Sequence, residues 1–232
     1  MRTLARLLAD LFFATGLQLG FLALYLLAWP LSLLGRRGVV LFRQMAGGIL
    51  RFLFWGGRLR PRLSGVEKLT PGRKTILLAN RPCRNAPFYL TAYFPVSPAL
   101  VISSRLLRFP VVGRVFRQLG FIPYPRQPEE RRAATAFALG LINALKHGDP
   151  VVIFIETFLG DSRRSRQQLE RLIEVARQTG SDLRPLLVTT RGVGNRPNRD
   201  IFLLGEVDLE LGPPWPLEEK ELPGRIRDYF HN

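Results

Sequence analysis

Few side chains in this sequence could serve as a base or a nucleophile at neutral pH. The chain has one cysteine and two histidines among its 232 residues. Cys83 lies in the segment NRPCRNA at residues 80–86, where Arg81 and Arg84 stand on either side of the thiol. Neighbouring arginines lower the pKa of a thiol, so Cys83 is a candidate nucleophile. The alternative is a loop cysteine with no chemical role.

One carboxylate and the two histidines complete the candidate bases. Glu156 ends an apolar segment and would act as a weak base if it were desolvated; the alternative is an ion pair with Arg81 or Arg126. His147 precedes the same segment, and seven residues of strand would put it about 23 Å from the strand's far end. His231 is penultimate, where chain ends fray, so it would reach a site only from a folded-back tail.

Short apolar segments that alternate with helical patterns must position these residues. This alternation is typical of an α/β fold in which helices flank a mostly parallel sheet. Strands are predicted at residues 74–80, 99–104, 121–125, 150–156 and 183–190, with one or two more in 201–212. Helices are predicted near residues 85–94, 111–119, 129–146 and 165–178. Ligands bind such sheets beyond the carboxyl ends of the strands, which predicts a site after Asn80, Ser104, Tyr124 and Glu156.

An N-terminal region, residues 1–62, precedes this α/β domain of residues 63–232 and has the pattern of a membrane anchor. Residues 11–34 carry no charge. As a helix they would be about 36 Å long, enough to cross a hydrocarbon core. Pro30 would bend the last turns. A cleaved signal peptide is the alternative, but no small-residue cleavage site follows the long apolar segment.

The next segment, residues 36–60, is apolar but interrupted by arginines. Four of them share an arc of about 80° on a helix with 100° per residue: Arg36, Arg43, Arg51 and Arg58. We expect this helix to lie in the headgroup layer, with its arginines on lipid phosphates and its other face among acyl chains. The alternative is a surface helix with a solvated basic face. More basic residues follow the first helix than precede it, which predicts that the α/β domain faces the cytoplasm from the inner membrane.

The charge balance limits the partners. The chain has 34 basic and 18 acidic residues and a formal net charge of +16, so it requires an acidic partner or surface. Basic residues follow the anchor and the candidate loops, and the sequence contains no nucleic-acid-binding motif. Anionic lipid headgroups are therefore the expected partner, rather than a nucleic acid. One cysteine excludes an intramolecular disulfide, and the residue pattern predicts neither a metal site nor a resident cofactor.

The order of these motifs resembles that of the 1-acylglycerol-3-phosphate acyltransferase family of bacterial membranes. That family has an NHxxxxD motif, a KxELxxxPxxGxxxRxxGxIxVxR block, an FPEGTRS motif and a proline-containing strand. The matching segments here are NRPCRNA at residues 80–86, SSRLLRFPVVGRVFRQLGFIPYPR at 103–126, FIETFLG at 154–160 and RPLLVTTRG at 184–192. The resemblance covers roughly residues 60–215 and implies the glycerol-phosphate acyltransferase fold and a role in phospholipid biosynthesis.

The resemblance also implies a reaction and a site. In the family, a His is the general base for a glycerol hydroxyl that attacks an acyl thioester, and an Asp orients the His. Arg81 and Ala86 occupy these two positions. Arg81 cannot accept a proton at neutral pH, and Ala86 has no polar side-chain group. The substrate-binding positions implied by the resemblance are Asn80, Arg81, Arg84, Gly113, Gly120, Arg126 and Glu156, with Arg126 a phosphate-binding arginine.

Two functions fit these residues. The first is a membrane-bound pseudoenzyme that binds a lysophospholipid or another glycerolipid phosphate, and an acyl thioester, without the usual dyad. The second is an active acyltransferase that moves an acyl chain from acyl-CoA or an acyl carrier protein (acyl-ACP) to a lysophospholipid such as 1-acylglycerol-3-phosphate. A positioned general base contributes roughly 10²–10⁴-fold to a rate, so its loss favours the first function.

Overall fold

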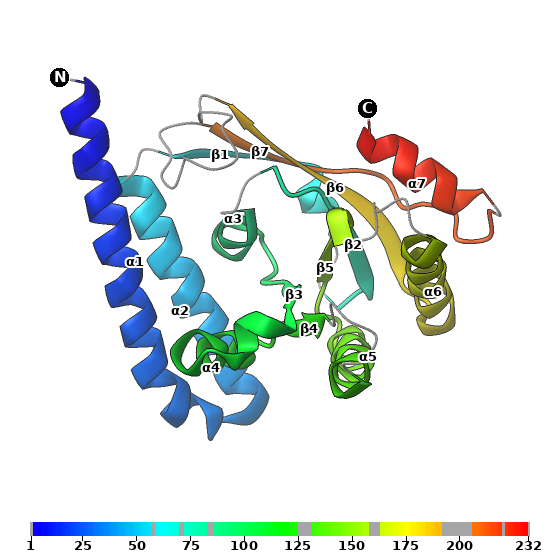
Figure 1. Ribbon diagram of the computed structural model, residues 1–232, viewed down its shortest axis with the longest axis horizontal. Helices are drawn as coiled ribbons and strands as arrows, with labels where there is room; N and C mark the ends of the chain where they lie inside the picture. The colour runs from blue at the N-terminus through cyan, green and yellow to red at the C-terminus, as the bar shows by residue number, and fades with distance from the viewer. Residues whose placement is uncertain are drawn as a thin grey trace.

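A seven-stranded sheet lies at the centre of the computed structural model, with a helical pair along one side (Figure 1). The structure describes residues 2–56, 59–69, 72–82, 86–124, 131–157, 163–191, 206–219 and 221–231. The strands are β1 (Arg60–Ser64), β2 (Thr75–Ala79), β3 (Ala99–Ser103), β4 (Ile122–Tyr124), β5 (Val151–Phe154), β6 (Asp182–Arg191) and β7 (Glu206–Leu211). The α-helices are α1 (Arg2–Ser32), α2 (Gly35–Gly56), α3 (Ala86–Tyr93), α4 (Pro110–Gln118), α5 (Arg131–Lys146), α6 (Arg163–Thr179) and α7 (Leu222–His231). Short 3-10 helices are η1 (Val66–Lys68), η2 (Ser104–Arg108) and η3 (Ile155–Thr157).

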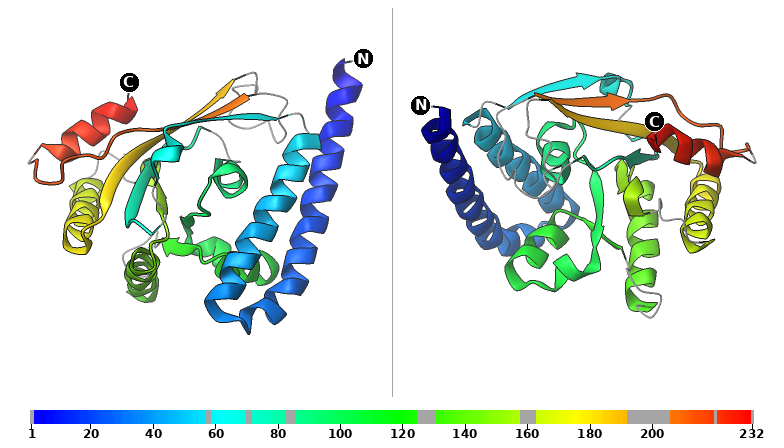
Figure 2. Two further views of the ribbon diagram at one scale, coloured as in Figure 1. Left: turned by 180° about the vertical axis from the view of Figure 1, so that it is seen from behind. Right: turned by 45° about the horizontal axis from the view of Figure 1, so that its top comes forward.

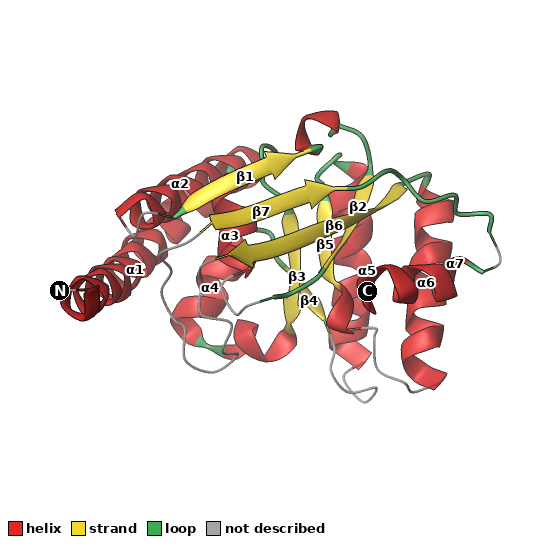
Figure 3. Cartoon of the chain, turned by 90° about the horizontal axis from the view of Figure 1, so that it is seen from above, coloured by secondary structure: helices red, strands yellow, loops and turns green. Residues whose placement is uncertain are grey.

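The sheet is mostly parallel, as the alternation of strands and helices predicted. Its strand order is β1-β7-β6-β2-β5-β3-β4. β2 pairs in parallel with β5 and β6, β3 pairs in parallel with β4 and β5, and β1 pairs in parallel with β7. Among the described strands, β6 and β7 form the antiparallel pair, seen from above in Figure 3. The predicted fold class is confirmed, and the carboxyl ends of β2, β3, β4 and β5 share one edge.

Strand β1 and helix α7 are not predicted by the local pattern. Residues 60–64 read RPRLS, without an apolar alternation, and they form a strand because they pair with residues 206–210 of β7. The predicted domain boundary after residue 62 therefore falls inside β1, and α2 ends at Gly56 rather than near residue 60. Helix α7 contains Pro223 and Gly224, which weaken the helical signal, but buries Leu222 and Ile226 in the core.

Helices α1 and α2 run antiparallel beside the sheet domain (Figure 2). A Cβ atom at Gly16 would lie 2.3 Å from Leu53 Cδ2, and one at Gly20 would lie 2.8 Å from Ile49 Cγ2. Small residues at these two positions therefore let the helices approach closely. By length and composition both helices could cross a membrane, through Ala14–Ser32 and Gly35–Gly56. Large apolar side chains exposed on the pair are Leu11, Phe12, Leu19, Leu22, Leu26, Trp29, Val40, Leu41, Met45, Phe52 and Trp55.

Of the arginines predicted to share one face of α2, Arg43 is buried against the α/β domain, which corrects the prediction that this residue contacts lipid phosphates. Arg43 is 5% exposed. Its Nε donates to Leu119 O at 2.7 Å, and its Nη1 donates to Ser97 O at 3.2 Å. The same Nη1 lies 3.1 Å from Asp149 Oδ2, so a buried ion pair joins α2 to the loop before β5. A guanidinium buried this deeply must be satisfied by the protein itself.

Arg36 and Arg51, on the same face of α2, also donate hydrogen bonds to the α/β domain, although both are exposed. Arg36 donates to Asp149 Oδ1 at 3.3 Å, and Arg51 donates to Ala92 O at 3.3 Å. Arg58 lies outside the described residues. The helical spacing correctly places these arginines on one face, but that face covers α3 and the amino-terminal edge of the sheet. Apolar residues lie on both sides of α2: Phe42, Leu50 and Leu53 are buried against the rest of the protein, whereas other large apolar side chains of the helix are exposed.

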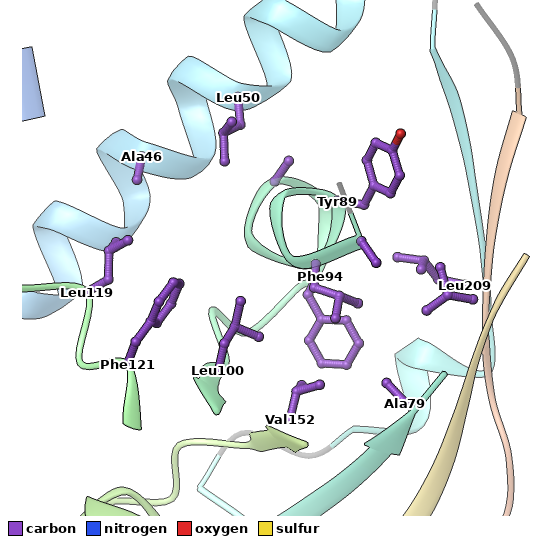
Figure 4. Close-up of a cluster of buried hydrophobic side chains, with 14 of the residues drawn as sticks. Ala46, Leu50, Ala79, Tyr89, Phe94, Leu100, Leu119, Phe121, Val152 and Leu209 are labelled. Atoms are coloured by element: carbon purple, nitrogen blue, oxygen red, sulfur yellow. The ribbon is translucent and has the colours of Figure 1, made fainter. Parts of the chain in front are cut away.

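Alternate residues of the buried strands supply two cores, one on each face of the sheet. On β2, Leu77 and Ala79 belong to the core covered by α2, α3 and α4, while Ile76 and Leu78 belong to the core covered by α5, α6 and α7. Figure 4 shows part of the first core, where Leu50 of α2 points toward α3 and Tyr89 lies between α3 and the strand that carries Leu209. Burial of both faces explains why these strands read as continuous apolar segments.

Candidate functional site

A cavity of about 420 Å³ lies at the carboxyl edge of the parallel strands. We call it the polar cavity. Four of its side chains follow or end the strands predicted to build a site, so the structure brings the ends of β2, β3, β4 and β5 together. Helix α6 adds Gln168, and η2 adds Leu106. The cavity is lined by Arg81, Pro87, Val101, Ile102, Ser103, Leu106, Tyr124, Phe154, Glu156 and Gln168.

Arg81 and Glu156 meet at the rim of the polar cavity. The backbone N–H of Arg81 donates to Glu156 Oε1 at 2.5 Å. The Arg81 guanidinium lies over the ring of Phe154, with Cζ 5.8 Å from the ring centroid, and the arginine is exposed. A cation in this position is held by the ring's electron-rich face while its N–H groups remain available to a ligand. The predicted contact between Glu156 and Arg81 therefore exists, but through the main chain.

Ser103 contributes a polar group that the sequence analysis did not single out. It ends β3, lines the polar cavity, and its Oγ is buried without a hydrogen-bond partner among the described residues. An unpaired buried hydroxyl is unfavourable unless water or a ligand satisfies it. The sequence signal that could have identified Ser103 is its position at the end of a predicted strand, where the ligand site was expected.

A second, apolar cavity of about 120 Å³ lies between the helical pair and α4. Sequence reasoning missed it because its walls come from α1, α2, α3 and α4. It meets the polar cavity at four residues that line both: Arg81, Pro87, Ile102 and Leu106. The other residues of this apolar cavity are Leu17, Gly20, Phe21, Leu24, Ala46, Ile49, Leu50, Phe88, Thr91, Val115, Phe116, Leu119 and Phe121.

Asn80 holds the start of the Arg81 loop against β6. Its Nδ2 donates to Val188 O at 2.8 Å, and its Oδ1 accepts from Val188 N at 2.6 Å. The amide thus continues the β2–β6 pairing by one residue beyond the strand. Asn80 was predicted to bind substrate, and the contacts it makes here are structural ones that fix the direction in which the loop leaves the sheet.

Replacing Asn80 with alanine should lower the free energy of unfolding by about 2–3 kcal/mol, because both polar groups of the buried Val188 peptide lose their partner. Thermal melting in detergent would measure the change. Gln168→Ala, which changes a residue that lines the polar cavity from α6, is the matched control and should change stability by less than about 0.5 kcal/mol. Equal stabilities of the two variants would contradict this role of Asn80.

Comparisons with known proteins agree with this architecture. The model of the Acyltransferase family matches residues 60–189. The chain belongs to the Acyltransferase family. Among solved structures it is similar to PlsC, the 1-acyl-sn-glycerophosphate (LPA) acyltransferase from Thermotoga maritima. The TM-score is 0.70 with 19% identity, and the match covers 99% of this chain and 94% of that chain. At this identity the likeness establishes a common fold. Comparison with curated proteins gives no match.

Arg81 and Ala86, which stand where the resemblance predicts the catalytic His and Asp, have different surroundings. Arg81 is exposed at the junction of the two cavities. Ala86 is the first residue of α3, is 0% exposed, and belongs to the core that includes Tyr89. A methyl group is well suited to that buried position, whereas a carboxylate there would need a partner. Ala86 therefore offers the site no polar group.

The two glycines predicted to bind substrate instead make packing contacts. A Cβ atom at Gly113 would lie 2.2 Å from Leu107 O, so this glycine lets α4 close onto η2. Gly120 has φ +69°, a conformation that favours glycine, and a Cβ atom there would lie 2.7 Å from Arg43 Nη2. Gly120 lines a separate hollow of about 390 Å³ with Arg43 and His147, away from the polar cavity. Both glycines thus have packing roles, and their predicted part in substrate binding stays a prediction.

Several predicted site residues cannot be placed. Cys83, Arg84 and Arg126 lie outside the described residues. The expectation that Arg126 shares a ligand cleft with Arg81 and Glu156, within about 12 Å of at least one of them, therefore stays a prediction. His147 lines the hollow beside Arg43 and is not among the residues that line the polar cavity, and its Nδ1 is 2.7 Å from Asn143 O. Among the described residues no group of three or more His, Cys, Asp or Glu side chains could hold a metal ion.

Proposed function

We propose that this acyltransferase-family protein binds a lysophospholipid or a related glycerolipid phosphate at the membrane. One observation carries the proposal: an apolar cavity and a polar cavity meet at Arg81 and Leu106. A lysophospholipid has the same division, with an acyl chain joined to a glycerol phosphate. The acyl chain would occupy the space between α1, α2 and α4, and the phosphate would lie in the polar cavity.

Two described groups support phosphate binding in the polar cavity. Arg81 presents a permanent positive charge, and the unpaired Ser103 hydroxyl can donate to a phosphate oxygen. Arg84 and Arg126 would complete the basic lining, as the sequence pattern predicted. Acyl-CoA or acyl-ACP would bring a thioester to the same cavity edge.

The proposal treats the protein as a pseudoenzyme, or as an enzyme with strongly altered catalysis. A glycerol hydroxyl that attacks a thioester must lose its proton to a base. Arg81 cannot take that proton, and the buried methyl of Ala86 cannot orient a base. We therefore expect no acyl transfer by the usual His/Asp route.

An active acyltransferase is the second candidate, and one observation favours it. The Glu156 carboxylate lines the polar cavity and is held by the Arg81 backbone N–H. As the base, it would take the proton of the lysophospholipid hydroxyl while the hydroxyl oxygen bonds to the thioester carbonyl and the thiolate leaves. Release of free thiol from acyl-CoA, lost in Glu156→Gln and retained in Cys83→Ser, would support this candidate. The reverse pattern would identify Cys83 as a covalent nucleophile.

The helical pair supports membrane association of the proposed complex. Many of its exposed side chains are large and apolar, while Arg43 and Arg51 donate hydrogen bonds to the α/β domain. Because α2 contacts that domain from Arg36 to Arg51, a perpendicular crossing would draw the domain toward the hydrocarbon layer. We propose that the pair lies in one leaflet of the inner membrane, with the α/β domain in the cytoplasm.

Replacing Arg81 with alanine tests the binding proposal. Affinity for lysophosphatidate should fall roughly tenfold to a hundredfold, the loss of one charge-assisted phosphate contact, while affinity for an uncharged monoacylglycerol should not change. Calorimetric titration of detergent-solubilised protein would measure both. Arg225→Ala, an exposed arginine on α7 paired with Glu219, is the matched control. Unchanged lysophosphatidate affinity in Arg81→Ala, with a normal melting temperature, would contradict phosphate binding at this position.

A further inference from the structure

A protruding corner of the α/β domain exposes apolar side chains beside the helical pair. It comprises residues 105–114, which run from η2 into the first turn of α4, and we call it the η2–α4 corner. Leu106 is 39% exposed, Phe109 57% and Val111 40%. A monomeric soluble domain seldom clusters such side chains within seven residues unless they contact a partner. The corner is therefore a candidate contact surface.

Arginines surround the apolar side chains of the corner. Arg105, Arg108 and Arg114 are all exposed. Acidic residues are nearly absent from this half of the chain, where Glu67 is the only one between Asp10 and Glu129. Exposed phenylalanine and valine among arginines form the pattern of a surface that inserts below an anionic headgroup layer.

The backbone of the corner is rigid. Pro110 occupies the first turn of α4, and Gly113 allows α4 to approach Leu107 O so closely that a Cβ atom would lie 2.2 Å from it. Arg117 Nη1 donates to the same carbonyl at 2.8 Å. A fixed backbone presents Phe109 and Val111 without the ordering cost that a flexible loop would have on insertion.

The corner adjoins the surface of α1 that carries exposed leucines. Arg114 Cζ lies 5.5 Å from the ring centroid of Tyr25, and Phe116 packs on Phe21 with centroids 6.0 Å apart. Figures 1 and 2 show α4 beside the helical pair. Leu106 also lines both cavities, so the corner forms one side of their junction.

We infer that the η2–α4 corner is a second membrane contact, which inserts Phe109 and Val111 among acyl chains and places Arg105 and Arg114 on anionic lipid phosphates. The inference rests on the proposed membrane function of the helical pair. A bilayer is favoured over an acidic protein because the corner continues the outward apolar surface of α1. Arg43 of α2 is buried and unavailable to lipid, whereas Arg105 and Arg114 of the corner are exposed.

This contact would determine how the lipid reaches its site. With Leu106 at the membrane surface, the junction of the two cavities opens toward the leaflet rather than toward the cytoplasm. A lysophospholipid then moves sideways from the bilayer into the site, and its acyl chain does not cross water. A water-soluble thioester would approach from the remaining side of the polar cavity.

Site-specific fluorescence quenching in vesicles tests the inference. Three variants of the full-length Cys83→Ser protein each carry one new cysteine, which replaces Phe109, Leu22 on α1, or the exposed Glu218 before α7. Each new cysteine is labelled with a polarity-sensitive dye. Vesicles contain phosphatidylcholine, phosphatidylglycerol and a lipid with a spin label on its acyl chain. Dyes at positions 22 and 109 should shift to shorter wavelength and be quenched, and the dye at 218 should not. In the 109-labelled protein, Arg105→Ala with Arg114→Ala should raise the phosphatidylglycerol fraction needed for quenching, whereas Arg225→Ala should not.

The outcomes separate this inference from the proposed function. Absence of quenching at position 22 would overturn membrane association itself. Quenching at 22 without quenching at 109 would leave the helical anchor intact and overturn the corner as a membrane contact. A dye at 109 that responds to an added acyl carrier protein and not to lipid would identify a protein-docking surface instead, and would also overturn the inference.

Discussion

Asp149→Ala should lower the free energy of unfolding by about 3–5 kcal/mol, because it leaves the buried guanidinium of Arg43 without its carboxylate. The Arg43 side chain is 6% exposed and the Asp149 side chain 23%, so water can replace the lost charge only poorly. Two backbone carbonyls would still accept from Arg43, but neither neutralises it. For a chain of this size the melting temperature should fall by roughly 6–20 °C, as thermal melting in mild detergent would show.

A matched pair of variants separates the buried charge from ordinary surface pairing. Glu206→Ala removes the partner of the exposed Arg62 and should cost less than about 1 kcal/mol. Adding Arg43→Met to Asp149→Ala should recover much of the lost stability, since the double variant contains no unpaired buried charge. An Asp149→Ala variant as stable as Glu206→Ala would show that the contact between α2 and the α/β domain does not depend on this ion pair.

Arg81→His combined with Ala86→Asp should raise thiol release from acyl-CoA in the presence of lysophosphatidate. A positioned base contributes roughly 10²–10⁴-fold, and we expect at most the lower end, about a hundredfold. The restoration stays partial because Thr157, Phe158 and Leu159 replace the Gly, Thr and Arg of the family's third motif. A thiol-reactive dye would follow the rate with purified protein and mixed micelles.

The single variants are the controls for this restoration. Arg81→His alone supplies a base that nothing orients, and it should gain less than the double variant. Ala86→Asp alone places a carboxylate at a position that is 0% exposed, so this variant should be destabilised by several kcal/mol. In the double variant, the imidazole introduced by Arg81→His should pair with the carboxylate and offset part of that cost. Rapid turnover by the unmodified protein would contradict the pseudoenzyme proposal, and the Cys83→Ser and Glu156→Gln variants would then identify the group responsible.

The local sequence pattern was sufficient to predict the central strands of the sheet and the edge at which the site lies. Strands β2, β3 and β5 are buried on both faces, so their sequences are continuous apolar segments with sharp ends. Parallel strands align their carboxyl ends, so Arg81, Tyr124 and Glu156 were expected to meet, and they line one cavity. The absence of a base at Arg81 and Ala86 also followed from residue chemistry alone.

The sequence by itself thus determined the fold class, the location of the polar cavity and the groups missing from it. The tertiary structure determined which elements pack against each side of the helices. The helical period shows that Arg36, Arg43 and Arg51 share one side of α2. The period is the same whether that side contacts lipid or protein, so it does not identify the contact. Only the tertiary structure shows that these three arginines donate to Asp149, Leu119 and Ala92 of the α/β domain. The apolar cavity likewise depends on Leu17, Ala46 and Phe116, which are distant in sequence and become neighbours only when three helices pack together.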